Sequence, residues 1–193
     1  LTRLVGSEMC IRDRISGVEA DDVIGTLAEQ ARKLKLDTVI STGDKDMTQL
    51  VCKNVSVVNT MTGELLDESG VKKKFGVSPE HITDYLALIG DKSDNVPGVD
   101  KVGPKTAVKW LDEYTSLENL IKNSEALSGK VGENLRSSID TLKLAHELVT
   151  IKKDVELPIG IEELKVGKED SEGLAKIYEE LEFKAWLQGE PQK

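Results

Sequence analysis

Seven carboxylates are concentrated in three short segments of this sequence. The segments read GVEADDVIG, STGDKDM and IGDKSDNVPG, and their acidic residues are Glu19, Asp21, Asp22, Asp44, Asp46, Asp91 and Asp94. Carboxylates held close together repel one another and raise each other's pKa unless cations neutralise them. Mg²⁺ or Mn²⁺ suits such a site because hard cations prefer oxygen ligands. If the three segments converge, we expect a two-metal site that can hydrolyse phosphodiesters.

Each segment also has an ordinary explanation. Glu19, Asp21 and Asp22 open a predicted helix, where acidic side chains complement the helix dipole by up to about 1 kcal/mol. Asp44 follows a predicted strand in an Asp-rich turn, and Asp91 lies in a polar loop after a helix. For any one segment the ordinary explanation is preferable. The conjunction of all three favours the metal site.

Other catalytic arrangements are missing from the sequence. It contains no Cys/His pattern for zinc and no G-x-S-x-G nucleophile motif. The two histidines, His81 and His146, fall on predicted helices, where we expect them to serve packing or the surface.

A Gly- and Lys-rich segment follows the third acidic cluster. Residues 97–111 read PGVDKVGPKTAVKWL, in which Gly98 and Gly103 allow a tight hairpin whose backbone can approach a ligand closely. The helix expected after it offers free N–H groups to a phosphate. Lys101, Lys105 and Lys109 are spaced by four, so those within the helix share a face. This pattern predicts a sequence-independent grip on a nucleic-acid backbone, with a solvated lysine stripe as the alternative.

Charge distribution agrees with that location. The net charge is −9, but residues 71–153 carry 13 basic side chains against 12 acidic ones. Residues 1–70 carry 8 against 12, and residues 154–193 carry 5 against 11. The middle of the chain is therefore the stretch suited to phosphate binding.

The elements that must position these residues alternate and then become helical. Apolar spacing predicts a helix from Ala20 to Leu34, and β-branched runs predict strands at 37–42, where the strand is buried, and at 55–59. Ser78-Pro79-Glu80 predicts a helix start with Ser78 as its cap. Further helices are predicted at 104–111, 116–122, 131–150 and 171–182. The fold class is therefore α/β with a helical extension.

Composition bounds the class of protein. Hydrophobic residues make up 38% and charged residues 32%, the balance of a soluble globular chain. No apolar run approaches the roughly 20 residues of a membrane span, so no membrane partner is expected. Two cysteines give no disulfide framework, which favours a reducing cytoplasm. We divide the chain into residues 1–14, a foreign or disordered tail, a partial α/β core at 15–89, and a helical region at 90–193.

Three motifs, in this order, resemble one family. GVEADDVIGTLA, VISTGDKDMTQLV and LALIGDKSDNVPGVDKVGPKTA look like the 5′-nuclease (5′-3′ exonuclease) domain of bacterial DNA polymerase I, a relative of the flap endonucleases. The resemblance covers about residues 16–188. It implies an incomplete Rossmann-like, PIN-like core followed by a helical region with a helix–three-turn–helix motif.

The resemblance implies roles at the matching positions. All seven carboxylates would be catalytic, and six of them would bind metal: Glu19, Asp21, Asp44, Asp46, Asp91 and Asp94. The helix–three-turn–helix would grip duplex DNA, and in relatives it binds K⁺ through main-chain carbonyls. Its DNA-binding residues would be Gly98, Lys101, Gly103, Lys105, Thr106 and Lys109. The implied reaction is metal-dependent hydrolysis near the 5′ end of a strand or flap, in replication and repair.

The resemblance also implies partners and a departure. The partner would be flapped, nicked or duplex DNA, and the chain would be a monomer natively joined to a polymerase region. The family's front portion supplies a first strand ending in Asp, another metal-ligand Asp and a basic helical arch, and nothing in residues 1–15 matches it. We therefore expect an impaired nuclease with an exposed sheet edge.

Three alternatives remain open. DKDMT matches the D-x-D-x-T of aspartyl-phosphate phosphohydrolases, with Asp44 as nucleophile, although this leaves the first acidic cluster and the hairpin without a role. That family would also place a strand where residues 78–89 predict a helix. The second alternative is a non-catalytic duplex-DNA-binding module. The third is an RNA-cleaving relative, although the helical hairpin favours duplex DNA.

Overall fold

The computed structural model describes residues 17–167 and 169–187. The predicted foreign or disordered tail, residues 1–14, lies outside these residues. The chain packs as two units, one comprising residues 17–161 and the other containing the described residues from 162 onward. The domain boundary expected after residue 89 stays a prediction.

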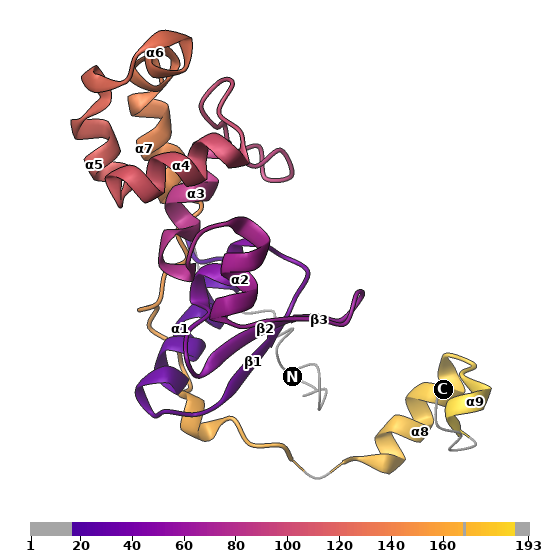
Figure 1. Cartoon of the computed structure of the whole chain (residues 1–193). Helices are drawn as coiled ribbons and strands as arrows, with labels where there is room; N and C mark the ends of the chain where they lie inside the picture. Colours follow the sequence, from indigo (N-terminus) through magenta and orange to yellow (C-terminus); the bar gives the residue numbers. More distant parts are fainter. Residues whose placement is uncertain (1–16, 168, 188–193) are drawn as a thin grey trace. The chain divides into compact units, whose positions relative to one another are not determined.

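The α/β part of the larger unit is a three-stranded sheet with helices beside it (Figure 1). Its elements are α1 (Ala20–Lys33), β1 (Thr38–Ser41), the 3-10 helix η2 (Asp46–Leu50), β2 (Val55–Asn59), β3 (Glu64–Leu66) and α2 (Glu68–Phe75). The strand order is β1-β2-β3, with β1 parallel and β3 antiparallel to β2. The sequence predicts α1, β1 and β2 correctly. It misses α2 and the three-residue β3, which is too short to show a period.

Local sequence explains where the first helices begin and end. α1 has Asp21 and Asp22 in its first turn and basic residues in its last turn, which suits the helix dipole at both ends. The Asp67 side chain caps α2 by accepting a hydrogen bond from the Gly70 amide at 2.7 Å. The lysines of residues 72–74 are exposed on α2.

One face of the sheet packs on the core and the other does not. Ile40, Val57 and Leu66 are buried, whereas Val39 is 63% and Leu65 60% exposed. Parallel strands are normally covered on both faces. The prediction of a buried strand at residues 37–42 is therefore wrong for Val39, because no described element covers that face of β1.

Helices make up the rest of the larger unit, with α3 between the sheet and the other helices (Figure 1). They are η3 (Pro79–His81), α3 (Ile82–Ile89), α4 (Pro104–Tyr114), α5 (Leu117–Lys122), η4 (Ser124–Ala126), α6 (Gly129–Ser137) and α7 (Ile139–Leu148). A single hydrophobic core continues from the sheet into these helices, through the buried Leu86, Leu111, Leu120, Leu135 and Leu142.

Two helix predictions need correction. Ser78 is at the N-cap position with Pro79 after it, as predicted, but its side chain makes no capping hydrogen bond and its hydroxyl donates to the Glu80 carboxylate at 3.1 Å. The element that it precedes is the 3-10 turn η3, and α3 follows that turn. The single helix predicted at 131–150 is two helices, α6 and α7, because the backbone at Ser138 departs from helical geometry.

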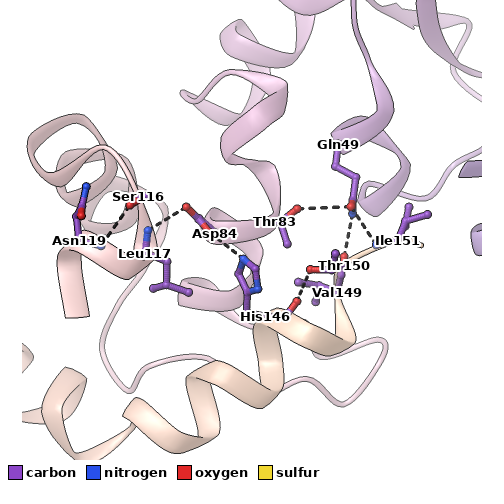
Figure 2. Close-up of polar contacts among 10 residues, drawn as sticks. All are labelled: Gln49, Thr83, Asp84, Ser116, Leu117, Asn119, His146, Val149, Thr150 and Ile151. Carbon is purple, nitrogen blue, oxygen red and sulfur yellow. Dashed lines mark hydrogen bonds and ion pairs between the residues drawn. The ribbon is translucent and has the colours of Figure 1, made fainter. Parts of the chain in front are cut away.

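A polar junction on α3 ties the other helices together (Figure 2). Asp84 accepts a hydrogen bond from the Leu117 amide at the start of α5 at 2.9 Å and lies 3.0 Å from the His146 ring on α7. Gln49 and Thr83 lie near the end of α7 in the same view. The histidine expected to serve packing is thus part of a structural contact.

The smaller unit contains α8 (Ser171–Glu180) and α9 (Lys184–Leu187). The 3-10 helix η5 (Ile161–Glu163) lies at the boundary, with its last two residues in the smaller unit. Tyr178, Phe183 and Trp186 stack there, with 5.3 Å between the ring centres of Tyr178 and Trp186. Trp186 is 48% exposed, whereas Trp110 on α4 in the larger unit is 6% exposed. No helix among residues 17–167 and 169–187 is long and apolar enough to cross a membrane.

Candidate metal centre and hairpin

The centre of the site is a group of three carboxylates from two segments. Asp46 lies at the start of η2, and Asp91 and Asp94 lie in the loop after α3. One oxygen from each lies within 4.8 Å of the others. Two of the three acidic segments, 45 residues apart in sequence, thus converge, and the first segment contributes no oxygen to this closest group.

Asp46 supplies the clearest sign that the group is built for a cation. Its Oδ1 is buried and has no hydrogen-bond partner, which is costly for a charged oxygen. Burial, and then the nearby charges of Asp44 and Asp91, raise the pKa of Asp46 to about 7. A divalent cation would satisfy the lone oxygen and offset the repulsion, so the residues present fit a hard metal ion.

Asp91 is held differently from Asp46. Its burial alone would raise its pKa, but hydrogen bonds from Lys45 and Ser93 outweigh burial and lower the pKa to about 2. The Lys45 ammonium lies 2.5 Å from Asp91 Oδ2, and the Ser93 amide donates to Asp91 Oδ1 at 2.8 Å. A backbone bridge between Asp91 and Val96 closes the loop. Asp91 is therefore a fixed, ionised carboxylate in the centre.

Three further carboxylates, Glu19, Asp21 and Asp44, interact electrostatically with this group or with one another. The pKa of Asp21 is raised by burial first and then by Asp44 and Glu19. The pKa of Asp94 is raised by burial and then by Asp91. Asp44 accepts a hydrogen bond from the Asp46 amide at 2.9 Å, which orients the turn before η2. The structure thus places six predicted metal ligands in one electrostatic neighbourhood.

Asp22 belongs to the same neighbourhood, since its charge also raises the pKa of Asp21, but it makes contacts that the other carboxylates lack. Its Oδ1 accepts a hydrogen bond from the Lys152 amide at 2.9 Å, and its Oδ2 accepts one from the Glu19 amide at 3.1 Å. It is 7% exposed, on the face of α1 that meets residues after α7. Both oxygens accept hydrogen bonds from the backbone, which fixes α1, and the predicted catalytic role of Asp22 stays a prediction.

The predicted hairpin follows Asp94 and rests on a very close approach of two backbones. Gly98 lies against the end of α3, where a methyl on it would come within 2.4 Å of the Ile89 carbonyl carbon. Gly90 faces it, with φ of +74°, a conformation that side chains rarely adopt. Lys101 also has positive φ, at +63°, which turns the chain toward α4. Gly98 is therefore required for packing.

The start of α4 presents the other hairpin residues. Gly103 caps the helix in open space, with no atom within 4 Å of a methyl placed on it. Lys105, Thr106 and Lys109 line a groove of about 520 Å³ between α4 and residues 126–132. Lys101 is exposed but is not part of that groove.

Sequence reasoning missed three residues that support the site. They are Lys45, which pairs with Asp91, Gln49 in η2, and Asn134 on α6. The Asn134 amide donates to the carbonyl and the carboxylate of Asp100, at 2.9 and 3.2 Å, and so braces the hairpin. Lys45, between two carboxylates, carries a local signal, whereas Gln49 and Asn134 act over long sequence separations.

Comparison with known families covers both parts of the larger unit. Residues 8–76 match the family described as 5′-3′ exonuclease, N-terminal resolvase-like domain. Residues 77–172 match the family described as 5′-3′ exonuclease, C-terminal SAM fold. The α/β part and the helical part thus correspond to the two domains of one family.

Individual relatives agree. The chain is 49% identical over 185 residues to DNA polymerase I of Pseudomonas aeruginosa, covering 90% of the chain and 20% of that protein. It is 43% identical over 173 residues to the 5′-3′ exonuclease of Aquifex aeolicus, covering 90% of the chain and 59% of that protein. A bacteriophage T5 flap endonuclease, solved as a pseudo-enzyme–product complex with DNA and metal ions, is similar with a TM-score of 0.65. That similarity is at 26% identity and covers 70% of this chain and 50% of the phage protein.

Proposed function

The chain belongs to the 5′-3′ exonuclease family, and from that premise we propose that it is a divalent-metal-dependent nuclease that hydrolyses DNA at 5′ ends and flaps. The observation that carries the proposal is the convergence of Asp46, Asp91 and Asp94, with a buried Asp46 oxygen that lacks any partner. The phage relative that was solved with DNA and metal ions supports the same chemistry.

The carboxylates would hold the metal in two groups. Asp46, Asp91 and Asp94 form the closest group, and Glu19, Asp21 and Asp44 lie next to it. Mg²⁺ or Mn²⁺, bound as a pair, would stabilise the attacking and leaving oxygens of a phosphodiester. Lys45 keeps Asp91 ionised and fixed, and the Asp44 carboxylate orients the turn that presents Asp46. The number of ions and their ligands are part of the proposal.

The hairpin and α4 would hold the DNA. Lys105 and Lys109 put two cationic side chains along one groove, beside the Thr106 hydroxyl, and the backbone at Gly103 is open to a ligand. Such contacts engage phosphates and carry no sequence information. A K⁺ ion bound by main-chain carbonyls of the hairpin, which the family resemblance implies, belongs to the same proposal.

The remaining expectations are also proposals. We propose that DNA with a 5′ flap, a nick or a duplex end is the partner, that the chain acts as a monomer, and that it is natively joined to a polymerase region. The DNA polymerase I relative supports the last of these. A bacterial cytoplasmic location and an impaired activity of the isolated chain stay predictions from the sequence.

A cleavage assay tests the proposal. The substrate is a 5′-labelled DNA flap with Mg²⁺ or Mn²⁺, and the control is the double variant Asp91→Asn/Asp94→Asn. We expect metal-dependent release of short 5′ products that the double variant abolishes. Equal cleavage by the variant would refute the role of the carboxylates. Salt-sensitive duplex binding without cleavage would instead favour the non-catalytic DNA-binding alternative, or an impaired nuclease whose DNA grip is intact.

A further inference from the structure

The segment after α7 lies along α1 through a regular series of hydrogen bonds. We call residues 149–161 the strap. Three side chains of α1, spaced by four and therefore on one helix face, each accept one backbone N–H of the strap. These pairs are Asp22 with Lys152 at 2.9 Å, Thr26 with Val155 at 3.1 Å, and Gln30 with Ile161 at 2.9 Å. One face of α1 thus holds the strap along its length.

Gln49 fastens the beginning of the strap to η2 (Figure 2). Its amide donates to the Val149 carbonyl at 2.8 Å, and its oxygen accepts from the Ile151 amide at 3.1 Å. The Thr83 hydroxyl lies 3.5 Å from the same oxygen. Gln49 is 8% exposed, so the loss of its side chain would leave two buried backbone groups unpaired.

The strap and α1 are in close contact at Gly25, next to a cavity of about 540 Å³ that Ala28, Glu29 and Lys153 also line. Gly25 faces the strap, and a methyl on it would lie 2.5 Å from Ile151 Cγ2 and 3.0 Å from the Lys152 carbonyl oxygen. Ile151 itself is 7% exposed. The contact at Gly25 and the three hydrogen bonds therefore tie the position of the strap to that of α1.

The strap connects the two halves of the proposed site. It begins where α7 ends, and the helical part is joined to the hairpin through the bond of Asn134 to Asp100. At its other contacts it holds α1, which presents Asp21, and η2, which begins with Asp46. Gln49 lies three residues after Asp46 in that same 3-10 helix.

We propose that the strap couples DNA binding at the hairpin to metal binding at the carboxylates, with Gln49 as the positioning residue at the junction. The inference rests on the proposed function and adds a regulation of the same site. DNA that fixes the helical part also fixes the strap, and the strap fixes η2 and α1 with their carboxylates. By linkage, bound DNA tightens metal binding, and bound metal tightens DNA binding by the same factor.

The experiment measures that factor with the full chain. Mn²⁺ affinity is determined by electron paramagnetic resonance with and without a closed dumbbell DNA duplex, which has no 5′ end to cleave. For the unaltered chain we expect the duplex to tighten Mn²⁺ binding about fivefold or more. In Gln49→Leu the factor should fall toward one, while Mn²⁺ binding alone and DNA binding alone stay within about threefold. The control Thr83→Val, which removes only the 3.5 Å contact, should keep the factor.

A second pair of variants covers the case in which Gln49→Leu fails to fold. Thr26→Val removes the hydroxyl that the Val155 amide donates to, whereas Thr26→Ser keeps it. We expect a smaller coupling factor in the valine variant than in the serine variant. An unaltered chain without coupling, a Gln49→Leu variant that keeps it, or a parallel loss of both separate affinities would overturn the inference. A chain that binds neither Mn²⁺ nor DNA would instead refute the proposed function, and the inference with it.

Discussion

The two hairpin glycines are expected to respond in opposite ways to the same substitution. In Gly98→Ala the new methyl would lie 2.4 Å from the Ile89 carbonyl carbon and 2.5 Å from the Gly90 nitrogen. Both opposing groups are backbone atoms, which cannot rotate away as a side chain can. In Gly103→Ala the methyl meets no atom within 4 Å, and the φ of −109° suits any residue.

The magnitudes follow from these distances. Overpacking a filled site costs typically about 1–3 kcal/mol, and a clash with backbone on both sides places Gly98→Ala near the upper end, at about 3 kcal/mol. For a chain of this size that free energy corresponds to a fall in Tm of about 6–12 °C. Gly103→Ala loses a favourable helix cap but also lowers the entropy of the unfolded chain. Its net cost should stay within about 1 kcal/mol.

DNA binding should separate the two positions further. If the backbone at Gly103 approaches a phosphate, the added methyl weakens binding by about 1–1.4 kcal/mol, or about five- to tenfold in Kd. Thermal melting by circular dichroism gives the stabilities, and gel mobility shift with a 5′-flap duplex gives the affinities. A Gly98→Ala chain that melts within 2 °C or so of the unaltered chain would refute the packing argument. A Gly103→Ala chain that binds DNA normally would refute the phosphate contact.

Three other perturbations test the centre and its supports. The pKa of Asp46 is raised to about 7, so below that pH a metal ion must displace a proton from this carboxyl group. Apparent Mn²⁺ affinity, measured in a titration from pH 5.5 to 8, should therefore rise by up to about tenfold per pH unit up to pH 7 and then level off. Lys45→Met should destabilise the metal-free chain at neutral pH by about 1–2 kcal/mol, after discounting for the partial exposure of the lysine, since Asp91 loses the cation that lowers its pKa. Asn134→Ala should weaken DNA binding about fivefold and leave Mn²⁺ affinity unchanged, because it frees Asp100 in the hairpin without touching the carboxylates.

Each of these has its own control. The sign of the Lys45→Met effect follows from the lowered pKa of Asp91. The ionised Asp91 carboxylate stabilises the folded chain above its unfolded pKa of about 3.8, and this stabilisation is lost as the pH falls toward 2. The unaltered chain and Lys45→Met should therefore have similar free energies of unfolding near pH 2. A difference that persists there would contradict the ion-pair explanation. Mn²⁺ affinity that is flat with pH would contradict a protonated Asp46, and Ser137→Ala on the same helix is the matched control for Asn134→Ala.

Sequence could identify the acidic residues but not how each is used. Short motifs show carboxylates directly, so the convergence of Asp46 with Asp91 and Asp94 could be inferred from their positions after a strand and after a helix. The contact of Asp22 with the Lys152 amide could not, because that amide is 130 residues away in the sequence. Every residue type except proline has the same backbone N–H and C=O groups, so a contact with the backbone cannot be predicted from residue types. The contacts of Gln49 with residues 149 and 151 could not be predicted for the same reason.

The helices and strands were predictable where the apolar pattern extends over several turns, and they were missed where the element is short. The 14 residues of α1 show several turns of apolar spacing, whereas β3 has three residues and α2 only eight. The break at Ser138 lies inside a continuous helical pattern, so packing rather than local preference divides α6 from α7. The exposure of Val39 depends on what lies over the sheet, which a local β-branched run cannot report.

The two tryptophans give each unit its own optical reporter. Trp110 is nearly enclosed on α4 in the larger unit, whereas Trp186 is half exposed beside Tyr178 in the smaller one. An enclosed indole emits at shorter wavelength than a hydrated one, so the blue part of the emission spectrum follows the larger unit and the red part follows the smaller. Replacing either tryptophan with phenylalanine leaves a single-reporter chain, in which the loosening of one unit can be followed by light alone, without an added dye.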